Sequence, residues 1–169
     1  EAEIASLAGY IYEAPAAAPD WSMEDIRASQ IIHYPTGTLG DEPVFEADMQ
    51  NLFIVVELGD HHATVLDGDK FEPIHRFRTR YALHGGPKYS SDGRYVYFAS
   101  RDGWISKFDM YRLETVAEIR AGINTRNAAI SADDRYVMVG NYLPHSLVIL
   151  DAHDLSLVRL IPVTDDHGS

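Results

Sequence analysis

The sequence contains no cysteine, which excludes disulfides, thiolate nucleophiles, iron–sulfur clusters and covalent heme attachment through C-x-x-C-H within these residues. It also has no run of 18 apolar residues, so it predicts no membrane-spanning helix, and it starts without the basic and apolar regions of a signal peptide. Positive charge is scarce, because 14 lysines and arginines stand against 26 acidic residues, for a formal net charge of -12. This balance argues against a general nucleic-acid-binding role, which needs a clustered positive surface.

The composition is that of one main globular unit, because 46% of the 169 residues are hydrophobic. The first residues differ in organisation from the rest. Ile4, Leu7, Ala8 and Ile11 occupy the i, i+3, i+4 and i+7 positions of a short amphipathic helix whose apolar face has no partner nearby in the sequence. This isolated helix and the absent initiator methionine suggest that residues 1–13 end a domain that lies upstream.

Residues 14–50 are predicted to connect that helix to the rest of the chain. The run Ala14–Pro19 favours a stiff, polyproline-prone linker. Ser22, followed three residues later by Asp25, is a carboxylate variant of the capping box and predicts a second short helix over Ser22–Ser29. From Gln30 to Gln50 prolines and glycines interrupt any periodicity, so this stretch is interpreted as an irregular surface connection.

A repeat organises residues 51–169. Strand-like segments end in Leu66-Asp67, Phe108-Asp109 and Leu150-Asp151, and the two steps between them are equal in length. The run Ser91–Tyr95 returns as Ala132–Tyr136 after a step that is shorter by only one position. A period of about 40–45 residues with four short strands per unit is typical of β-propeller blades, so the sequence predicts an all-β fold with about three blades. Three blades cannot close a ring, so we expect a partial propeller, the first blades of a larger one.

The strands of each unit can be placed from their alternation and turn residues. The second and third units are predicted to contain the strands Ala82–Tyr89, Tyr95–Ser100, Trp104–Asp109, Thr115–Arg120, Arg126–Ser131, Tyr136–Asn141, Leu147–Asp151 and Leu157–Val163. The first unit contains only Leu52–Glu57, Ala63–Asp67 and Pro73–Thr79, with no clear innermost strand before them. The aspartates that recur at the strand ends favour turn hydrogen bonding rather than chemistry.

His84 is the leading candidate for a functional residue. It heads an apolar run and precedes Gly85-Gly86-Pro87, where the first strand of the second unit would line the central channel. Arg126 is its repeat equivalent in the third unit, to within one residue. A neutral imidazole nitrogen is a good ligand for heme iron, and an arginine at the same height can hold a carboxylate. The two glycines would let a planar macrocycle approach the backbone closely.

Each candidate also has a structural interpretation. His84 could be a histidine that is hydrogen-bonded within a strand. Asn141, Tyr142 and His145 flank a Leu-Pro-His turn and could serve only to form it. Lys88, four residues after His84, could be a surface charge or a second contact to an anion. The residue types alone leave both interpretations open.

The segment YALHGGPKYSSDGRYVYFASRDGWISKFD, which starts at Tyr81, resembles the heme d1 propeller of cytochrome cd1 nitrite reductase and its relatives. GINTRNAAISADDRYVMVGNYLPHSLVILDAHDL, starting at Gly122, continues the resemblance. WSMEDIRAS, from Trp21, is similar to the segment that joins the cytochrome c domain to that propeller, and residues 1–13 resemble the last helix of such a domain. Within the superfamily, His-Gly-Gly-Pro-Lys and Gly-Asn-Tyr-Leu-Pro-His look most like the dihydro-heme d1 dehydrogenases. The resemblance covers nearly the whole chain and implies an eight-bladed propeller.

The resemblance also implies roles for individual residues. His84 corresponds to the proximal ligand of the heme iron, Arg126 to an arginine near the acidic side chains of heme d1 or dihydro-heme d1, and Tyr142 to a pocket tyrosine. Further cofactor-binding candidates are Lys88, Asn141 and His145. An arginine that the reductases place in the first hairpin is missing here, where Leu58–His61 occupies the region. The catalytic residues on the distal side are expected in later blades, beyond Ser169.

The reaction implied by the resemblance is dehydrogenation of a propionate side chain of dihydro-heme d1 to the acrylate of heme d1, with electron transfer to heme c in an upstream domain. Such an oxidoreductase of heme d1 biosynthesis would act in denitrification, in the periplasm, with cytochrome cd1 nitrite reductase or other maturation proteins as possible partners. We expect this part of the protein alone to be inactive. The alternatives are a nitrite reductase that forms nitric oxide, and a non-catalytic heme d1 carrier or propeller interaction module.

Overall fold

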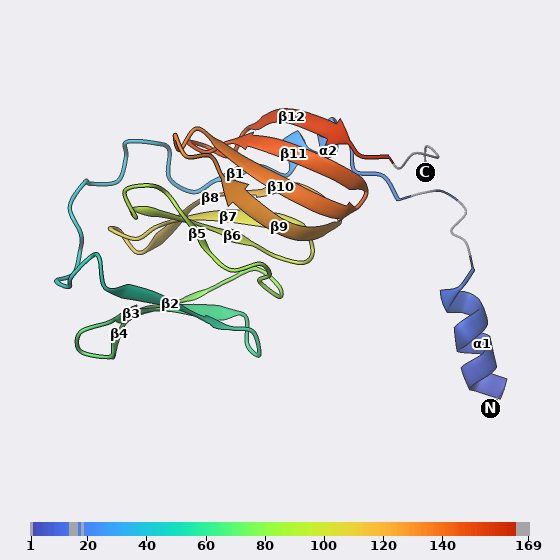
Figure 1. Cartoon of the computed structure of the whole chain (residues 1–169), viewed down its shortest axis with the longest axis horizontal. Helices are drawn as coiled ribbons and strands as arrows, with labels where there is room; N and C mark the ends of the chain where they lie inside the picture. Colours follow the sequence, from blue (N-terminus) through green and yellow to red (C-terminus); the bar gives the residue numbers. More distant parts are fainter. Residues whose placement is uncertain (1, 14–16, 18, 165–169) are drawn as a thin grey trace.

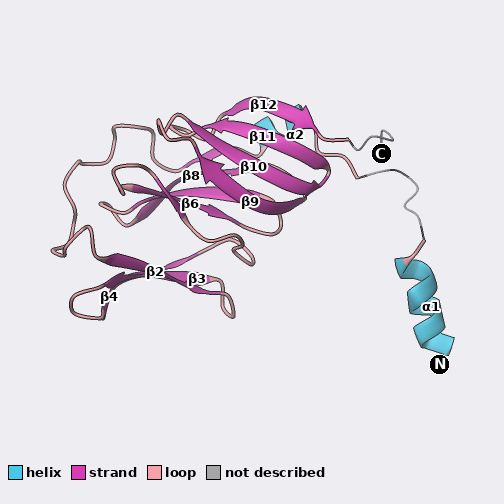
Figure 2. Cartoon of the chain, in the orientation of Figure 1, coloured by secondary structure: helices cyan, strands magenta, loops and turns pink. Residues whose placement is uncertain are grey.

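The computed structural model describes residues 2–13, 17 and 19–164 and confirms an all-β, propeller-like architecture. Three antiparallel sheets stand side by side as blades (Figure 1). Within the described residues, two short helices accompany these sheets (Figure 2). Neither helix is long and apolar enough to cross a membrane. The blades follow one another along the chain, as the sequence repeat predicted.

The second blade contains five strands in the order β1-β8-β7-β6-β5. Their bounds are Ile31–Ile32 for β1, Lys88–Tyr89 for β5, Tyr95–Ala99 for β6, Trp104–Asp109 for β7 and Glu114–Arg120 for β8. The third blade has the order β12-β11-β10-β9. Its strands are β9 (Asn124–Ile130), β10 (Tyr136–Leu143), β11 (His145–Asp151) and β12 (Leu157–Pro162).

The first blade has three described strands in the order β2-β3-β4, and no innermost strand among the described residues, as predicted. The strands are β2 (Leu52–Glu57), β3 (His62–Asp67) and β4 (Glu72–Arg78). Stacking of Phe77 on Phe108, with ring centroids 4.1 Å apart, joins the first blade to the second. The Tyr97 hydroxyl donates to the carbonyl of Ala152 at 2.8 Å and joins the second blade to the third.

The aspartates that recur once in each repeat form the turns that precede β4, β8 and β12. The carboxylates of Asp67, Asp109 and Asp151 each accept a hydrogen bond from the backbone N–H two residues later, at 2.8–2.9 Å. The residue four positions later adopts a positive φ in each turn, at Phe71, Leu113 and Leu155. Its N–H donates to the aspartate carbonyl at 2.8 Å in all three turns. The predicted role in turn hydrogen bonding is confirmed.

Within residues 14–50, predicted as a linker with a short helix, the structure shows a short strand in addition to the helix. Ile31–Ile32 is the strand β1, which pairs with Glu118 and Ala117 of β8. The second helix, α2 (Met23–Ala28), has the predicted capping box at Ser22 and buries Ile26 completely. This segment therefore belongs to the propeller, because its apolar side chains complete the core between the blades. A two-residue strand is too short to produce a recognisable alternation.

The innermost strand of the second blade is also shorter than predicted. Instead of the strand Ala82–Tyr89, the structure has only β5 and an isolated bridge between Leu83 and Ser100. Ala82, Gly85 and Gly86 all adopt positive φ values, which strands do not contain. His84 therefore lies in a loop at the end of the blade, and its backbone N–H donates to Ala99 at 2.7 Å.

The N-terminal helix α1 (Ala2–Ile11) confirms the predicted amphipathic segment. Ile4, Leu7 and Ile11 are each more than 60% exposed. Figure 1 shows α1 away from the three sheets. Most of the predicted polyproline-prone run Ala14–Pro19 lies outside the described residues.

Candidate functional site

The imidazole of His84 is held in one tautomer by the neighbouring blade. Its Nδ1 lies 2.8 Å from the backbone oxygen of Arg126 in β9. A carbonyl oxygen can only accept a hydrogen bond, so Nδ1 must carry the proton. In the neutral ring Nε2 therefore keeps its lone pair, which is the atom that a metal ion would need. Histidines that bind a metal through one ring nitrogen commonly donate from the other nitrogen to a carbonyl or carboxylate. In His84 the backbone carbonyl of Arg126 is that acceptor.

The guanidinium of Arg126 contacts the same ring. Its Nη1 lies 3.0 Å from Nε2 and 3.5 Å from Nδ1 of His84, so it sits over the face of the ring. The ring of Tyr142 in β10 lies 6.0 Å from the guanidinium carbon of Arg126. The structure thus brings together three of the predicted site residues, His84, Arg126 and Tyr142, from two blades. Arg126 and Tyr142 are exposed, whereas His84 is half-buried.

The two glycines after His84 differ in the space available for a side chain. A Cβ on Gly85 would lie 2.2 Å from the side-chain oxygen of Asn127, so the absent side chain leaves room for a residue of β9. A Cβ on Gly86 would meet nothing within 4 Å. Only Gly86 therefore faces open space of the kind a planar ligand could use. Both glycines were predicted to let a planar macrocycle approach the backbone. At Gly85 the missing side chain instead makes room for Asn127 of the neighbouring blade.

An apolar cavity of about 190 Å³ lies beside His84, between the first and second blades. Apart from His84 and Gly86, its walls are the side chains of Val56, Leu58, Leu83, Pro87, Phe98 and Ala99. Leu58 is 57% exposed at the tip of the first hairpin. The sequence interpretation did not include this leucine, an apolar residue within a hairpin turn, among the site residues. The combination of a nitrogen donor and apolar walls suits the apolar part of a ligand that lies against His84.

Lys88 and Asn141 are engaged with the protein itself. The Lys88 ammonium donates to the carbonyl of Gly85 at 2.6 Å and so holds the glycine loop. Asn141 is 8% exposed, and its amide bonds to Thr125, Ala121 and Ser146 at 2.7–3.1 Å. These contacts assign Asn141 a structural task within the third blade. Val137, Val139 and Asn141 are alternate residues of one strand, so their side chains point to the same face. The apolar valines therefore indicated that Asn141 points into the blade core.

His145 lies at the start of β11, where it is exposed and is the cross-strand partner of Tyr142. The turn between them is Leu143-Pro144, which has a cis peptide bond. His145 therefore stands next to the residues that gather around His84, one strand further out. Its placement is compatible with a site at this end of the blades.

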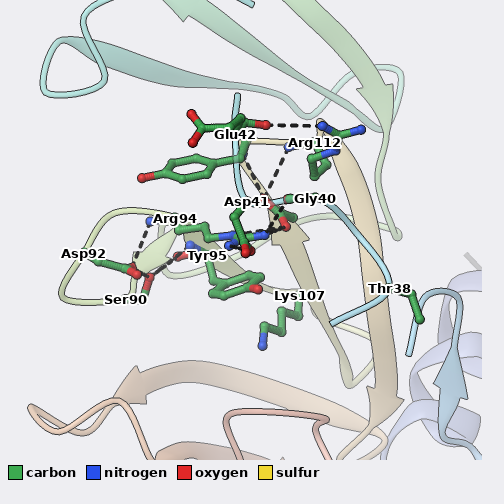
Figure 3. Close-up of polar contacts among 12 residues, drawn as sticks. Thr38, Gly40, Asp41, Glu42, Ser90, Asp92, Arg94, Tyr95, Lys107 and Arg112 are labelled. Carbon is green, nitrogen blue, oxygen red and sulfur yellow. Dashed lines mark hydrogen bonds and ion pairs between the residues drawn. The ribbon is translucent and has the colours of Figure 1, made fainter. Parts of the chain in front are cut away.

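A second polar cluster lies at the opposite end of the second blade and was not predicted (Figure 3). It borders a cavity of about 400 Å³ under the segment 32–41. Arg94 bridges Asp109 and Asp41 at 3.0 and 2.9 Å. The buried Lys107 ammonium donates to the carbonyls of Ala152 and His153 and lies 3.9 Å from the centroid of the Tyr95 ring. These contacts tie the connecting segment and the third blade to the second.

Burial changes the acid–base properties of this cluster. It lowers the pKa of Lys107 to about 8, because the ammonium form is desolvated more than nearby aspartates compensate. It also raises the pKa of Tyr97 above its ordinary value. Both groups already have hydrogen-bond partners within the fold, so the cluster is best described as inter-blade structure.

Comparison with known proteins shows the family of the chain. Residues 47–169 match the family described as "Cytochrome D1 heme domain". The chain belongs to this family. The matched region contains every strand of the three blades except β1, and it includes His84 and Arg126.

Two curated relatives and one solved structure define the likeness within the cytochrome D1 heme domain family. The chain is 64% identical over 163 residues to dihydro-heme d1 dehydrogenase of Pseudomonas aeruginosa, covering 96% of this chain and 33% of that protein. It is 28% identical over 165 residues to nitrite reductase of Stutzerimonas stutzeri, covering 94% and 29%. The solved structure of dihydro-heme d1 dehydrogenase NirN in complex with DHE is 62% identical, with a TM-score of 0.92 over 100% of this chain and 36% of that one. The chain spans about a third of the length of the curated relatives that it matches.

Proposed function

We propose that the whole protein is an oxidoreductase that dehydrogenates a propionate side chain of dihydro-heme d1 to the acrylate of heme d1. The observation that carries this proposal is the 64% identity to dihydro-heme d1 dehydrogenase across a region that contains His84 and its partner Arg126. The 28% identity to nitrite reductase is much lower over a similar span. This difference favours the biosynthetic activity over nitrite reduction.

The residues around His84 fit an iron tetrapyrrole. His84 offers a nitrogen lone pair in a fixed tautomer, the adjoining cavity has apolar walls, and Gly86 leaves open space beside the ring. His84 would hold the iron from the proximal side, and Arg126 would hold a carboxylate of the substrate through paired hydrogen bonds. Tyr142 and His145 would border the same end of the pocket. Lys88 would act indirectly, by fixing the carbonyl of Gly85.

The reaction converts a CH₂–CH₂ unit to CH=CH and releases two electrons and two protons. The tetrapyrrole would supply a ring conjugated with the new double bond, and heme c in an upstream domain would accept the two electrons one at a time, with an external electron acceptor reoxidising it between them. The task of this part of the chain is to bind and orient the substrate. The groups that accept the protons are expected in later blades. Residues 1–13 would then be the last helix of the cytochrome c domain.

Conversion of dihydro-heme d1 by the full-length protein, followed by absorption spectroscopy, tests the proposal. Wild-type protein should produce heme d1, and His84→Ala should weaken tetrapyrrole binding at least a hundredfold, roughly the upper range for loss of groups that support a metal ligand. The matched control is His153→Ala, an exposed histidine in the turn at the opposite end of the strands. Equal binding by His84→Ala and His153→Ala would remove His84 from the ligand role.

The same preparation separates the two alternatives. Nitric oxide formed from nitrite, without desaturation of dihydro-heme d1, would identify a nitrite reductase. Tight binding of heme d1 with neither reaction would identify a carrier. We further propose a periplasmic location and delivery of heme d1 to a cytochrome cd1 nitrite reductase, which cell fractionation and co-purification would test.

A further inference from the structure

We propose that Trp21 and Arg120 form a joint that fixes the direction in which the upstream segment leaves the blades, and that Trp21 is thereby a positioning residue for electron transfer to the upstream domain. This inference rests on the proposed function, because it concerns how the cytochrome c domain is held while the tetrapyrrole is oxidised. The contacts of the joint lie at the end of β8 and take no part in the proposed tetrapyrrole site.

Trp21 is the first residue along the described part of the chain that is not exposed. Residues 3–13, 17, 19 and 20 are all exposed, whereas Trp21 is half-buried and packs against the core between the second and third blades. The indole Nε1 donates to the backbone carbonyl of Arg120, the last residue of β8, at 3.0 Å. The centroid of the indole ring also lies 4.7 Å from the guanidinium carbon of Arg120. One residue of the blade thus holds Trp21 through a hydrogen bond and a cation–π contact.

The helix that follows, α2, is attached to the blades independently of Trp21. The Oγ of Ser29, at the end of α2, accepts a hydrogen bond from the N–H of Arg120 at 2.9 Å, and Ile26 is completely buried. Trp21 therefore adds little to the attachment of α2 and determines instead the direction of the chain before it. Pro19 extends this constraint upstream, because its ring fixes its own φ.

Arg120 also connects the joint to the loop that carries His84. Its Nε donates to the carbonyl of Asp102, in the turn between β6 and β7, at 2.9 Å. In the same turn the N–H of Arg101 donates to the carbonyl of Ala82 at 3.0 Å, two residues before His84. The joint therefore lies at the end of the blades where His84 lies. A domain that accepts electrons from a ligand of His84 has to approach this end.

Loss of the indole would leave residue 21 held only through its bond to Ser22, the N-cap of α2. Because consecutive Cα atoms are about 3.8 Å apart, the position of residue 21 could then vary over up to about 7 Å around Ser22. The upstream domain would change its position with it. Electron transfer slows steeply as the distance between two cofactors grows, so a domain that swivels accepts electrons more slowly although the tetrapyrrole binds as before.

The distance between two spin labels measures the joint without any tetrapyrrole. Labels at Ser6→Cys on α1 and Lys70→Cys on the first blade, both exposed positions, report the placement of the upstream helix in the full-length protein by double electron–electron resonance. Trp21→Ala should widen the distance distribution by about 7 Å, and Trp21→Phe, which keeps a ring but loses the N–H, should widen it less. Met23→Ala is the control, because Met23 is exposed two positions later. Equal widths in Trp21→Ala and Met23→Ala would overturn the joint.

Stopped-flow absorption then separates positioning from binding. With dihydro-heme d1, Trp21→Ala should bind the tetrapyrrole within about twofold of the wild-type affinity but should reduce heme c at least about threefold more slowly. Arg120→Met removes the guanidinium and keeps the indole, so it tests the joint in both experiments even where Trp21→Ala does not fold, and it should act in the same direction. A rate of heme c reduction equal to that of Met23→Ala in both variants would overturn the positioning role. If no form of the protein oxidises dihydro-heme d1, the proposed function fails, whereas the label distances still decide whether the joint exists.

Discussion

Replacement of Glu118 by glutamine should destabilise the outer strands of the second blade, β8 and β1. Glu118 in β8 is only 8% exposed, and its carboxylate accepts hydrogen bonds from Arg80 at 2.8 and 2.6 Å, from Ser106 at 2.8 Å and from His33 at 3.1 Å. These partners come from the connector between blades one and two, from β7 and from the segment after β1. One buried carboxylate therefore joins three separate parts of the chain.

The size of the destabilisation follows from the loss of the charged partner of Arg80. Loss of one partner of a buried ion pair typically costs about 3–5 kcal/mol. The side chain of Arg80 is 32% exposed and can be partly rehydrated, so the cost should lie at or below the lower limit of that range, at about 2–3 kcal/mol. Backbone amides of β1 and β8 that exchange through opening of this region should then exchange about 30-fold to 150-fold faster.

Hydrogen exchange of the full-length protein, read by mass spectrometry over β1, β7 and β8, measures this change. Glu114→Gln is the matched control, because Glu114 lies in the same strand and is exposed. The effect should also depend on pH. Burial raises the pKa of Glu118, but hydrogen bonds from Arg80, Ser106 and His33 outweigh it, and the net pKa lies below the ordinary value of 4.5. The stabilisation is thus complete above pH 4.5 and is lost as pH falls through the lowered pKa. Similar exchange in Glu118→Gln and Glu114→Gln at neutral pH would refute the reasoning.

Three further predictions use equally simple comparisons. Gly103→Ala should destabilise the protein by several kcal/mol more than Gly93→Ala in thermal unfolding: both glycines have positive φ, but only at Gly103 would a Cβ meet a carbonyl oxygen, at 1.8 Å. Relative to Lys107→Met, wild-type stability should rise by about 3 kcal/mol between pH 8 and 10.5, because the lowered pKa of Lys107, about 8, makes the unfolded state bind more protons there. Asn141→Ala should cost about 2–3 kcal/mol in urea unfolding through unmade buried hydrogen bonds, whereas Tyr142→Phe should change stability by less than about 0.5 kcal/mol.

The blades could be predicted from the sequence because their turns reuse the same chemistry. Asp109 caps its turn with a side chain and a carbonyl that both accept from nearby N–H groups, and Asp67 and Asp151 do the same. Such contacts are local and do not depend on the rest of the fold. The strand β1 could not be predicted in this way. It exists because β8, which is distant in the sequence, offers a free edge, as the pairing of Ile32 with Ala117 shows.

The site could be predicted only in part. The repeat step from His84 to Arg126 correctly indicated that the two residues lie together. It could not indicate that the backbone oxygen of Arg126 sets the tautomer while its side chain lies over the ring, because these contacts depend on how the loop that carries His84 is placed against β9. The predicted strand would have placed His84 in a regular ladder. The loop instead releases its ring to reach the next blade.

The repeat itself distinguishes positions whose residue type recurs in every blade from positions where it changes. Where the residue type recurs at the same phase, as at Asp67, Asp109 and Asp151, the side chain is consumed by a turn that every blade must make. Where the phase is kept but the residue type changes, as between His84 and Arg126, no shared structural demand dictates the side chain. His84 and Arg126 occupy equivalent positions of neighbouring blades, and these two positions lie next to each other in the structure. In this chain the repeated backbone therefore brings two different side chains, those of His84 and Arg126, into contact.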